Sequence, residues 1–126
     1  MQSASVDGSF IEHVLEHIGL DDVFHLLDEC RRVLRPGGVM RVSVPDFRKY
    51  AQSYLGDPSF LEELRPRRPT RLLAVDEVIH RHGHRSVWDA PTMVSALAAA
   101  DFVDPQESAF HRSKLPNIPD APCVHR

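Results

Sequence analysis

The pattern of apolar and polar positions near the start of the chain predicts a helix, a tight turn and a strand. Apolar residues recur at helical spacing over 21–34 and form one stripe, with Asp21 placed to act as N-cap. The Pro-Gly-Gly segment at 36–38 predicts a sharp end to this helix. The β-branched run at 39–44 then predicts a strand. Helix, turn and strand in this order favour a largely parallel sheet.

The segment before this unit has a weaker pattern. Residues 9–17 begin like the end of a strand and finish like a short helix, with apolar Phe10, Ile11, Val14 and Leu15. Residues 3–9 are small and polar and have a weak preference for strand. We therefore expect only a poor strand at this end of the sheet.

After residue 44 the pattern predicts short helices and loops. Seven of the ten prolines lie in 58–69 and 105–122, where they interrupt any long element. The expected elements are a helix from Asp46 to about Tyr54, one or two helical turns at 59–64, a loop at 65–70, a helix at 71–79, a helix at 90–100, an extended segment at 102–110 and an irregular tail at 113–126.

Composition narrows the class of protein. The 126 residues suffice for a single domain, and 42% apolar with 26% charged residues is ordinary for a globular protein. The net charge of −3 does not favour binding to nucleic acid, which is itself negatively charged. No apolar run could span a membrane and no secretory signal is recognised, so we expect no nucleic-acid or membrane partner and a cytoplasmic location.

Histidines and cysteines offer a metal site only in principle. His80, His82 and His84 alternate, and on a strand they would share one face. No fourth ligand accompanies them, so a solvated loop is the preferred interpretation and no metal site is predicted. Cys30 and Cys123 lie far apart, which suggests neither a disulfide framework nor a zinc cluster.

Two further features invite a binding role and have a simpler explanation. The arginines at 65, 67, 68 and 71 could hold a phosphate, but we expect them to keep a proline-rich loop soluble. Trp88 beside Val87 is expected to pack in the interior, and Cys30, on the apolar stripe, is expected to be a core residue.

Five short motifs follow one another along the chain. They are HVLEHI at 13–18, the segment 27–38 that ends in RVLRPGG, RVSVPD at 41–46, HGHRSVWD at 82–89 and AADF at 99–102. In this order they resemble the central and later motifs of class I, S-adenosylmethionine-dependent methyltransferases of the type 11 kind. The resemblance covers roughly 6–110 and implies an α/β, partial Rossmann-like methyltransferase fold, with an incomplete, mostly parallel sheet and flanking helices.

Two features of that family are not found. The family carries a glycine-rich loop after its first strand and an acidic residue after its second, which hold the cofactor. No two glycines here form a GxG loop between a strand and a helix. The resemblance thus implies the C-terminal portion only, without the last strand of the fold. We expect this chain alone to be inactive and to bind S-adenosylmethionine very weakly or not at all.

The resemblance also implies site residues. It places Glu12 and His13 next to the methionine part of the cofactor, and Asp46 on the acceptor side of the same crevice. Methyl transfer requires an aligned nucleophile and removal of its proton, for which His13, Glu16 or Asp46 are the catalytic candidates. The simpler alternative is that Glu16 and His17 end a short helix and that Asp46 caps the next one.

The sequence therefore supports two classes of function. The first is a methyltransferase acting on an unknown small-molecule acceptor. The second is a non-catalytic, self-associating interaction module, and a metal-binding protein that uses the histidines at 80–84 is a weaker third. An incomplete parallel sheet exposes unpaired edges, so we expect a homo-oligomer in either of the first two cases.

Overall fold

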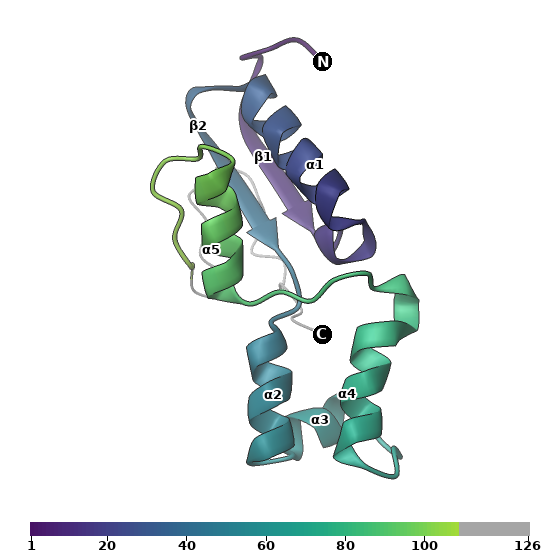
Figure 1. Cartoon of the computed structure of the whole chain (residues 1–126). Helices are drawn as coiled ribbons and strands as arrows, with labels where there is room; N and C mark the ends of the chain where they lie inside the picture. The colour runs from purple at the N-terminus through teal and green to yellow at the C-terminus, as the bar shows by residue number, and fades with distance from the viewer. Residues whose placement is uncertain (109–126) are drawn as a thin grey trace.

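The computed structural model describes residues 1–108, which form a small sheet with two helices and a separate group of three helices (Figure 1). This confirms the expected α/β class with a partial, parallel, Rossmann-like sheet. Within the described range, every helix is too short or too polar to cross a membrane. In chain order the elements are β1 (Val6–Glu12), the 3-10 turn η1 (Leu15–His17), α1 (Leu20–Val33), β2 (Leu34–Ser43), α2 (Phe47–Leu55), α3 (Ser59–Leu64), α4 (Arg71–His80), the 3-10 turn η2 (Arg81–Gly83) and α5 (Ala90–Ala99).

The two strands pair in parallel, and their register contains an irregularity. Val6 pairs with Leu34, and pairing resumes at Gly8 with Val39, so residues 35–38 bulge out of β2. The predicted Pro-Gly-Gly turn is this bulge, in which Gly37 has a φ of +82°. The strand β1 is longer than its weak local propensity predicted, because pairing with β2 supplies the hydrogen bonds that its sequence does not favour by itself.

The helix α1 matches the predicted apolar stripe but begins earlier than expected. The prediction of Asp21 as N-cap is wrong, since Gly19 holds that position. The Val23 amide donates to the Gly19 carbonyl at 2.9 Å, which starts the helix ahead of Asp21. Asp21 lies instead in the first turn, where its charge faces the positive end of the helix dipole.

The sheet layer, which we define as β1, β2, α1 and α5, has its own hydrophobic core. One face of the sheet supplies Ile11 from β1 and Met40 and Val42 from β2. The buried partners in the same cluster come from η1, α1 and α5 and from the segment before α5: Leu15, Val23, Leu27, Trp88, Met93, Ala96 and Ala100. Burial on this face explains why the apolar positions of α1 and α5 repeat at helical spacing.

The other face of the sheet carries alternate residues. Phe10 pairs with Arg41 in the register, and the Arg41 guanidinium lies 5.7 Å from the centre of the Phe10 ring. Phe10 is 38% exposed. No described strand pairs with the outer edge of β1 or of β2, because the described sheet has two strands.

The helical layer, which we define as α2, α3 and α4, lies beyond the carboxyl ends of the strands (Figure 1). Its small core consists of Tyr50, Leu61, Ala74 and Val78. Asp46 caps α2 and Thr70 caps α4 through side-chain oxygens that accept from backbone amides. These helices confirm the predictions for 46–54, 59–64 and 71–79.

The C-terminal part of the described chain differs in one respect from expectation. The helix α5 confirms the prediction for 90–100, with Asp89 as N-cap. The extended segment expected from 102 is wrong over 102–108, where bends and irregular chain follow α5. The Phe102 amide donates to the Leu97 carbonyl at 3.1 Å, which folds the chain back on the helix. The predicted tail at 113–126 and Cys123 lie outside the described residues.

Candidate functional site

The carboxyl ends of β1 and β2 place the predicted site residues at one edge of the sheet. Because the strands are parallel and in register, Glu12 at the end of β1 pairs with Ser43 at the end of β2. His13 follows Glu12 directly, and its amide donates to the Ser43 carbonyl at 2.9 Å. This edge is where open α/β sheets bind their ligands.

His13 has an unusual backbone conformation. Its φ is +51°, in the left-handed region that most residues avoid, although histidine enters it more readily than most residues do. Its Nδ1 atom lies 3.3 Å from Oε1 of Glu16, which orients the imidazole. The structure thus brings together two of the three residues predicted to be catalytic.

Glu16 lies in η1 and is only 2% exposed. Besides the contact with His13, its Oε1 atom is 3.8 Å from Nε2 of His17. Its Oε2 atom is buried and has no hydrogen-bond partner. Its backbone carbonyl accepts from the amides of Arg85 at 2.6 Å and Ser86 at 3.3 Å. Glu16 does sit in a short helical turn, as the simpler alternative held, but a buried carboxylate is more than a helix end requires.

Asp46 is occupied as a helix cap. Its Oδ1 atom accepts from the Arg48 amide at 3.0 Å, at the start of α2. Its backbone forms a bridge with Trp88, and the next amide, that of Phe47, donates to the Trp88 carbonyl at 2.8 Å. The capping alternative for Asp46 is therefore what the structure shows, and Asp46 lies shortly after the end of β2.

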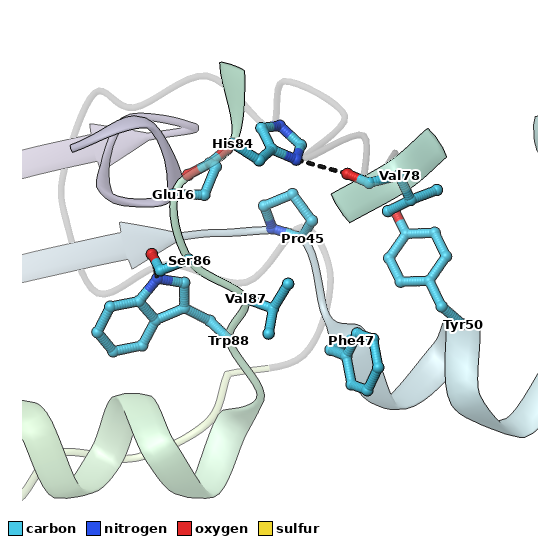
Figure 2. A pocket seen from close by; sticks show the side chains of 9 residues that line it. All are labelled: Glu16, Pro45, Phe47, Tyr50, Val78, His84, Ser86, Val87 and Trp88. Atoms are coloured by element: carbon cyan, nitrogen blue, oxygen red, sulfur yellow. Dashed lines mark hydrogen bonds between the residues drawn. The ribbon is translucent and has the colours of Figure 1, made fainter. Parts of the chain in front are cut away.

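A cavity lies where the sheet layer meets the helical layer (Figure 2). Its volume of about 10 Å³ holds one water molecule, whereas ligand pockets measure hundreds of Å³. The described residues therefore enclose no space for the adenosine part of a cofactor at this point. The lining comprises Glu16, Pro45, Phe47, Tyr50, Val78, His84, Ser86, Val87 and Trp88.

Tyr50 is a member of this lining that the sequence did not single out. Its hydroxyl is buried without a hydrogen-bond partner, and burial raises the pKa of the phenol above its ordinary value. The neutral O–H is thus retained, and it is a donor that faces the junction of the two layers (Figure 2). The only signal in the sequence was its place on the apolar side of α2.

The three alternating histidines do not share a strand face. His80 ends α4 and is exposed, with Nε2 3.5 Å from Asp76. His82 lies in η2 with a φ of +66°. His84 follows η2, is half-buried, and packs edge-on against His17 with 4.7 Å between the ring centres. The strand geometry behind the weaker metal hypothesis is therefore wrong, and His84 instead joins the residues after β1.

The remaining candidates have structural roles. Arg65 and Arg68 lie against Glu77 of α4, and Arg71 donates to the carbonyls of Tyr54 and Gly56. Trp88 is buried in the sheet-layer core, and its indole N–H donates to Ser86 Oγ at 2.8 Å. Trp88 packs in the interior as expected, whereas Arg65, Arg68 and Arg71 make ion pairs and hydrogen bonds and do not only keep the loop soluble.

Cys30 also behaves as a core residue. It packs against the sheet-layer cluster and carries a free thiol. Desolvation raises the pKa of this thiol, so the reactive thiolate is disfavoured.

Comparison with known proteins supports the resemblance over the first third of the chain. Residues 1–42 match a family model described as a methyltransferase domain. The matched segment runs from the N-terminus through most of β2, is similar to a methyltransferase domain, and includes Glu12, His13 and Glu16. No significant match was found among curated proteins or among solved structures.

Proposed function

We propose that the chain forms the acceptor-facing part of a methyltransferase domain that transfers a methyl group from S-adenosylmethionine to a small-molecule acceptor. One observation carries the proposal. His13 and Glu16 meet at the carboxyl end of β1, inside the segment that matches the methyltransferase domain. The left-handed backbone of His13 is the kind of strained position that clusters at functional sites.

The described residues fit only part of the cofactor. They offer a carboxylate and imidazoles at the edge of the sheet, and the cavity there holds no more than one water. None of the glycines within 1–108 belongs to a GxG loop between a strand and a helix. We therefore assign to this chain the part of the crevice near the reacting methyl group, and not the nucleotide site.

In this role the chain would handle the proton of the acceptor. S-adenosylmethionine, when bound, supplies an electrophilic methyl group on a sulfonium. A hydroxyl or amine acceptor must lose its proton as it attacks, and His13 would accept that proton. Glu16 would orient the His13 ring through the 3.3 Å contact and stabilise the imidazolium that forms. Asp46 would serve by capping α2 and so shaping the acceptor side.

Nuclear magnetic resonance tests this proposal on the intact chain. We expect S-adenosylmethionine to bind with a dissociation constant above about 1 mM, which corresponds to roughly 4 kcal/mol or less of binding free energy. Shift changes should be confined to residues 12–17 and 43–47. His13→Ala should abolish them, and His25→Ala, at an exposed position of α1, should not. Shift changes centred on other residues, or changes that persist in His13→Ala, would contradict the proposal.

A second candidate function, self-association, is favoured by a separate observation. The sheet face that carries Phe10 leaves this ring 38% exposed, and β1 and β2 each have one edge without a described neighbouring strand. Such edges pair readily with another chain. Exposed apolar residues on both layers, including Leu20, Phe24, Leu55 and Leu72, add to the surface that association would bury.

Light scattering after size-exclusion chromatography tests self-association. We expect a mass above 14.3 kDa that falls on dilution. Phe10→Asp should shift the population toward the monomer, whereas Val103→Asp, at a position 94% exposed outside the sheet, should not. A 14.3 kDa species at every concentration would contradict this candidate and leave the methyltransferase proposal intact.

A further inference from the structure

We propose that Glu16, His17 and His84 bind a divalent transition-metal ion, with Zn²⁺ as the best fit. Each of the three residues offers one ligand atom, and these atoms all lie within 4.8 Å of one another. Donors bound at about 2.1 Å to a tetrahedral metal lie about 3.4 Å apart. Side-chain shifts on the order of 1 Å would therefore close the three residues onto one ion.

The buried carboxylate of Glu16 is the observation that points to a ligand. The residue is 2% exposed, yet its Oε2 atom has no hydrogen-bond partner. An ionised carboxylate in such a place is costly unless it is paired or coordinates a metal. The neighbouring imidazoles of His13 and His17 lie 3.3 Å and 3.8 Å from the other oxygen, Oε1. A cation bound to Glu16 would offset the free-energy cost of burying a carboxylate oxygen that has no hydrogen-bond partner.

His84 is held in the form that binds metals. Its Nδ1 atom lies 2.7 Å from the carbonyl oxygen of Val78, which can only accept a hydrogen bond (Figure 2). Nδ1 must therefore carry the proton, and in the neutral ring Nε2 keeps its lone pair. Metal-binding histidines commonly donate their second nitrogen to a backbone carbonyl in this way.

The ligands are brought together by the tertiary structure and are fixed there by backbone bonds. Glu16 and His17 lie in η1 after β1, and His84 lies in the chain between η2 and α5. The amides of Arg85 and Ser86 both donate to the Glu16 carbonyl, so the chain beside His84 is tied to η1. The edge-on packing of His17 on His84 keeps the rings adjacent. This anchoring pre-forms the site and lowers the entropy lost on binding.

The ligand set indicates the class of metal. Two imidazoles and one carboxylate suit Zn²⁺ and neighbouring first-row ions, whereas Mg²⁺ and Ca²⁺ prefer all-oxygen sites. Three protein ligands leave at least one coordination position for water or another molecule. Because the site lies at the carboxyl end of β1, this position would open at the edge of the sheet where ligands are expected.

Titration of the full, untagged chain with ZnCl₂ and CoCl₂ tests the site. We expect binding of one ion per chain, a rise in melting temperature reversed by a chelator, and the visible absorption of tetrahedral Co²⁺. His17→Ala and His84→Ala should each weaken binding at least about tenfold. His80→Ala and His25→Ala are the controls, because both residues are exposed and neither belongs to the group, so binding should be unchanged.

Glu16→Gln keeps the test decisive even where a histidine variant fails to fold. The amide has the same shape and is cheaper to bury, so this variant should melt at or above the metal-free wild-type temperature. It should also lose the response to Zn²⁺. The proposal is overturned when the wild-type chain shows no metal response, when the response survives in Glu16→Gln, or when it disappears in His80→Ala. None of these outcomes depends on methyl transfer, so the proposed function stands or falls separately.

Discussion

In the sheet layer, strand pairing joins residues far apart in the chain, whereas in the helical layer most contacts join neighbours in sequence. β1 and β2 are separated by all of α1 and still pair along their length. The helices α2, α3 and α4 follow one another with short connections, and a core of four buried residues holds them together. The methyltransferase match covers β1, α1 and most of β2, and it includes neither α5 nor the helical layer.

The sheet layer and the helical layer also differ in the interactions that stabilise them. Leu15, Val23 and Leu27 of the sheet layer are completely buried, which indicates a core held by apolar packing. In the helical layer, Glu77 takes contacts from Arg65, Arg68 and Arg81. The candidate site therefore lies at the boundary between the sheet layer and the helical layer, which have separate cores. Backbone bonds from Phe47 to Trp88 and from Arg85 to Glu16 join them.

The largest loss of stability should come from truncating one buried leucine in each hydrophobic core. Leu27→Ala and Leu61→Ala each remove a buried side chain and should each cost about 2–5 kcal/mol. Because the two clusters share no member, we expect Leu61→Ala to lower the unfolding midpoint seen by helical circular dichroism more than the midpoint seen by Trp88 fluorescence. Leu27→Ala should lower both midpoints. Equal shifts of both signals in Leu61→Ala would show that the layers unfold as one unit.

A smaller effect is expected at the bulge of β2. Gly37 has a φ of +82°, so Gly37→Val should cost roughly 1–3 kcal/mol through backbone strain alone. No atom lies within 4 Å of the position where a Cβ would be, so steric conflict adds nothing. Gly37→Asn is the control, since asparagine tolerates the left-handed region and should retain most of the stability. Thermal melts that do not distinguish the two variants would contradict the bulge geometry.

Acid should destabilise the helical layer through Glu77. Hydrogen bonds from Arg68 and Arg81 lower the pKa of Glu77 from 4.5 to about 2. A carboxyl with a lowered pKa stabilises the fold above its unfolded pKa, and this contribution is lost as the pH falls from 4.5 toward 2. Glu77→Gln should remove this part of the pH dependence, as measured by circular dichroism. Glu63→Gln, at an exposed position of α3, should leave it in place.

The smallest loss of stability is expected at Asp46, which caps α2 at the boundary between the two layers. Asp46→Ala should cost about 1 kcal/mol, because the cap of α2 is lost, and Asp46→Asn should recover most of that stability. Thermal melts of the two variants measure the difference. Asp89→Ala, at the matching cap of α5, provides the reference for a cap that lies away from the predicted catalytic residues. If Asp46 is only a cap, Asp46→Asn will also leave any ligand response at residues 12–17 unchanged.

The sequence by itself determined most elements that depend on local chemistry. The stripe of α1, the cap Asp46 and the end of α2 before residue 58 are readable because periodicity, capping and proline act within a few residues. The motif HVLEHI also placed His13 and Glu16 after a strand, as the structure does. The partial α/β fold followed from the same local signals.

Only the tertiary structure decided β1 and the composition of the site. The weak local propensity of β1 is overridden by its pairing with β2. His84 has an unremarkable place in an arginine-flanked loop, and nothing near it in sequence announces its contact with His17. Glu16 becomes a buried carboxylate only once residues 84–88 fold over it. Contacts between distant segments depend on how all the layers pack, and no local pattern encodes them.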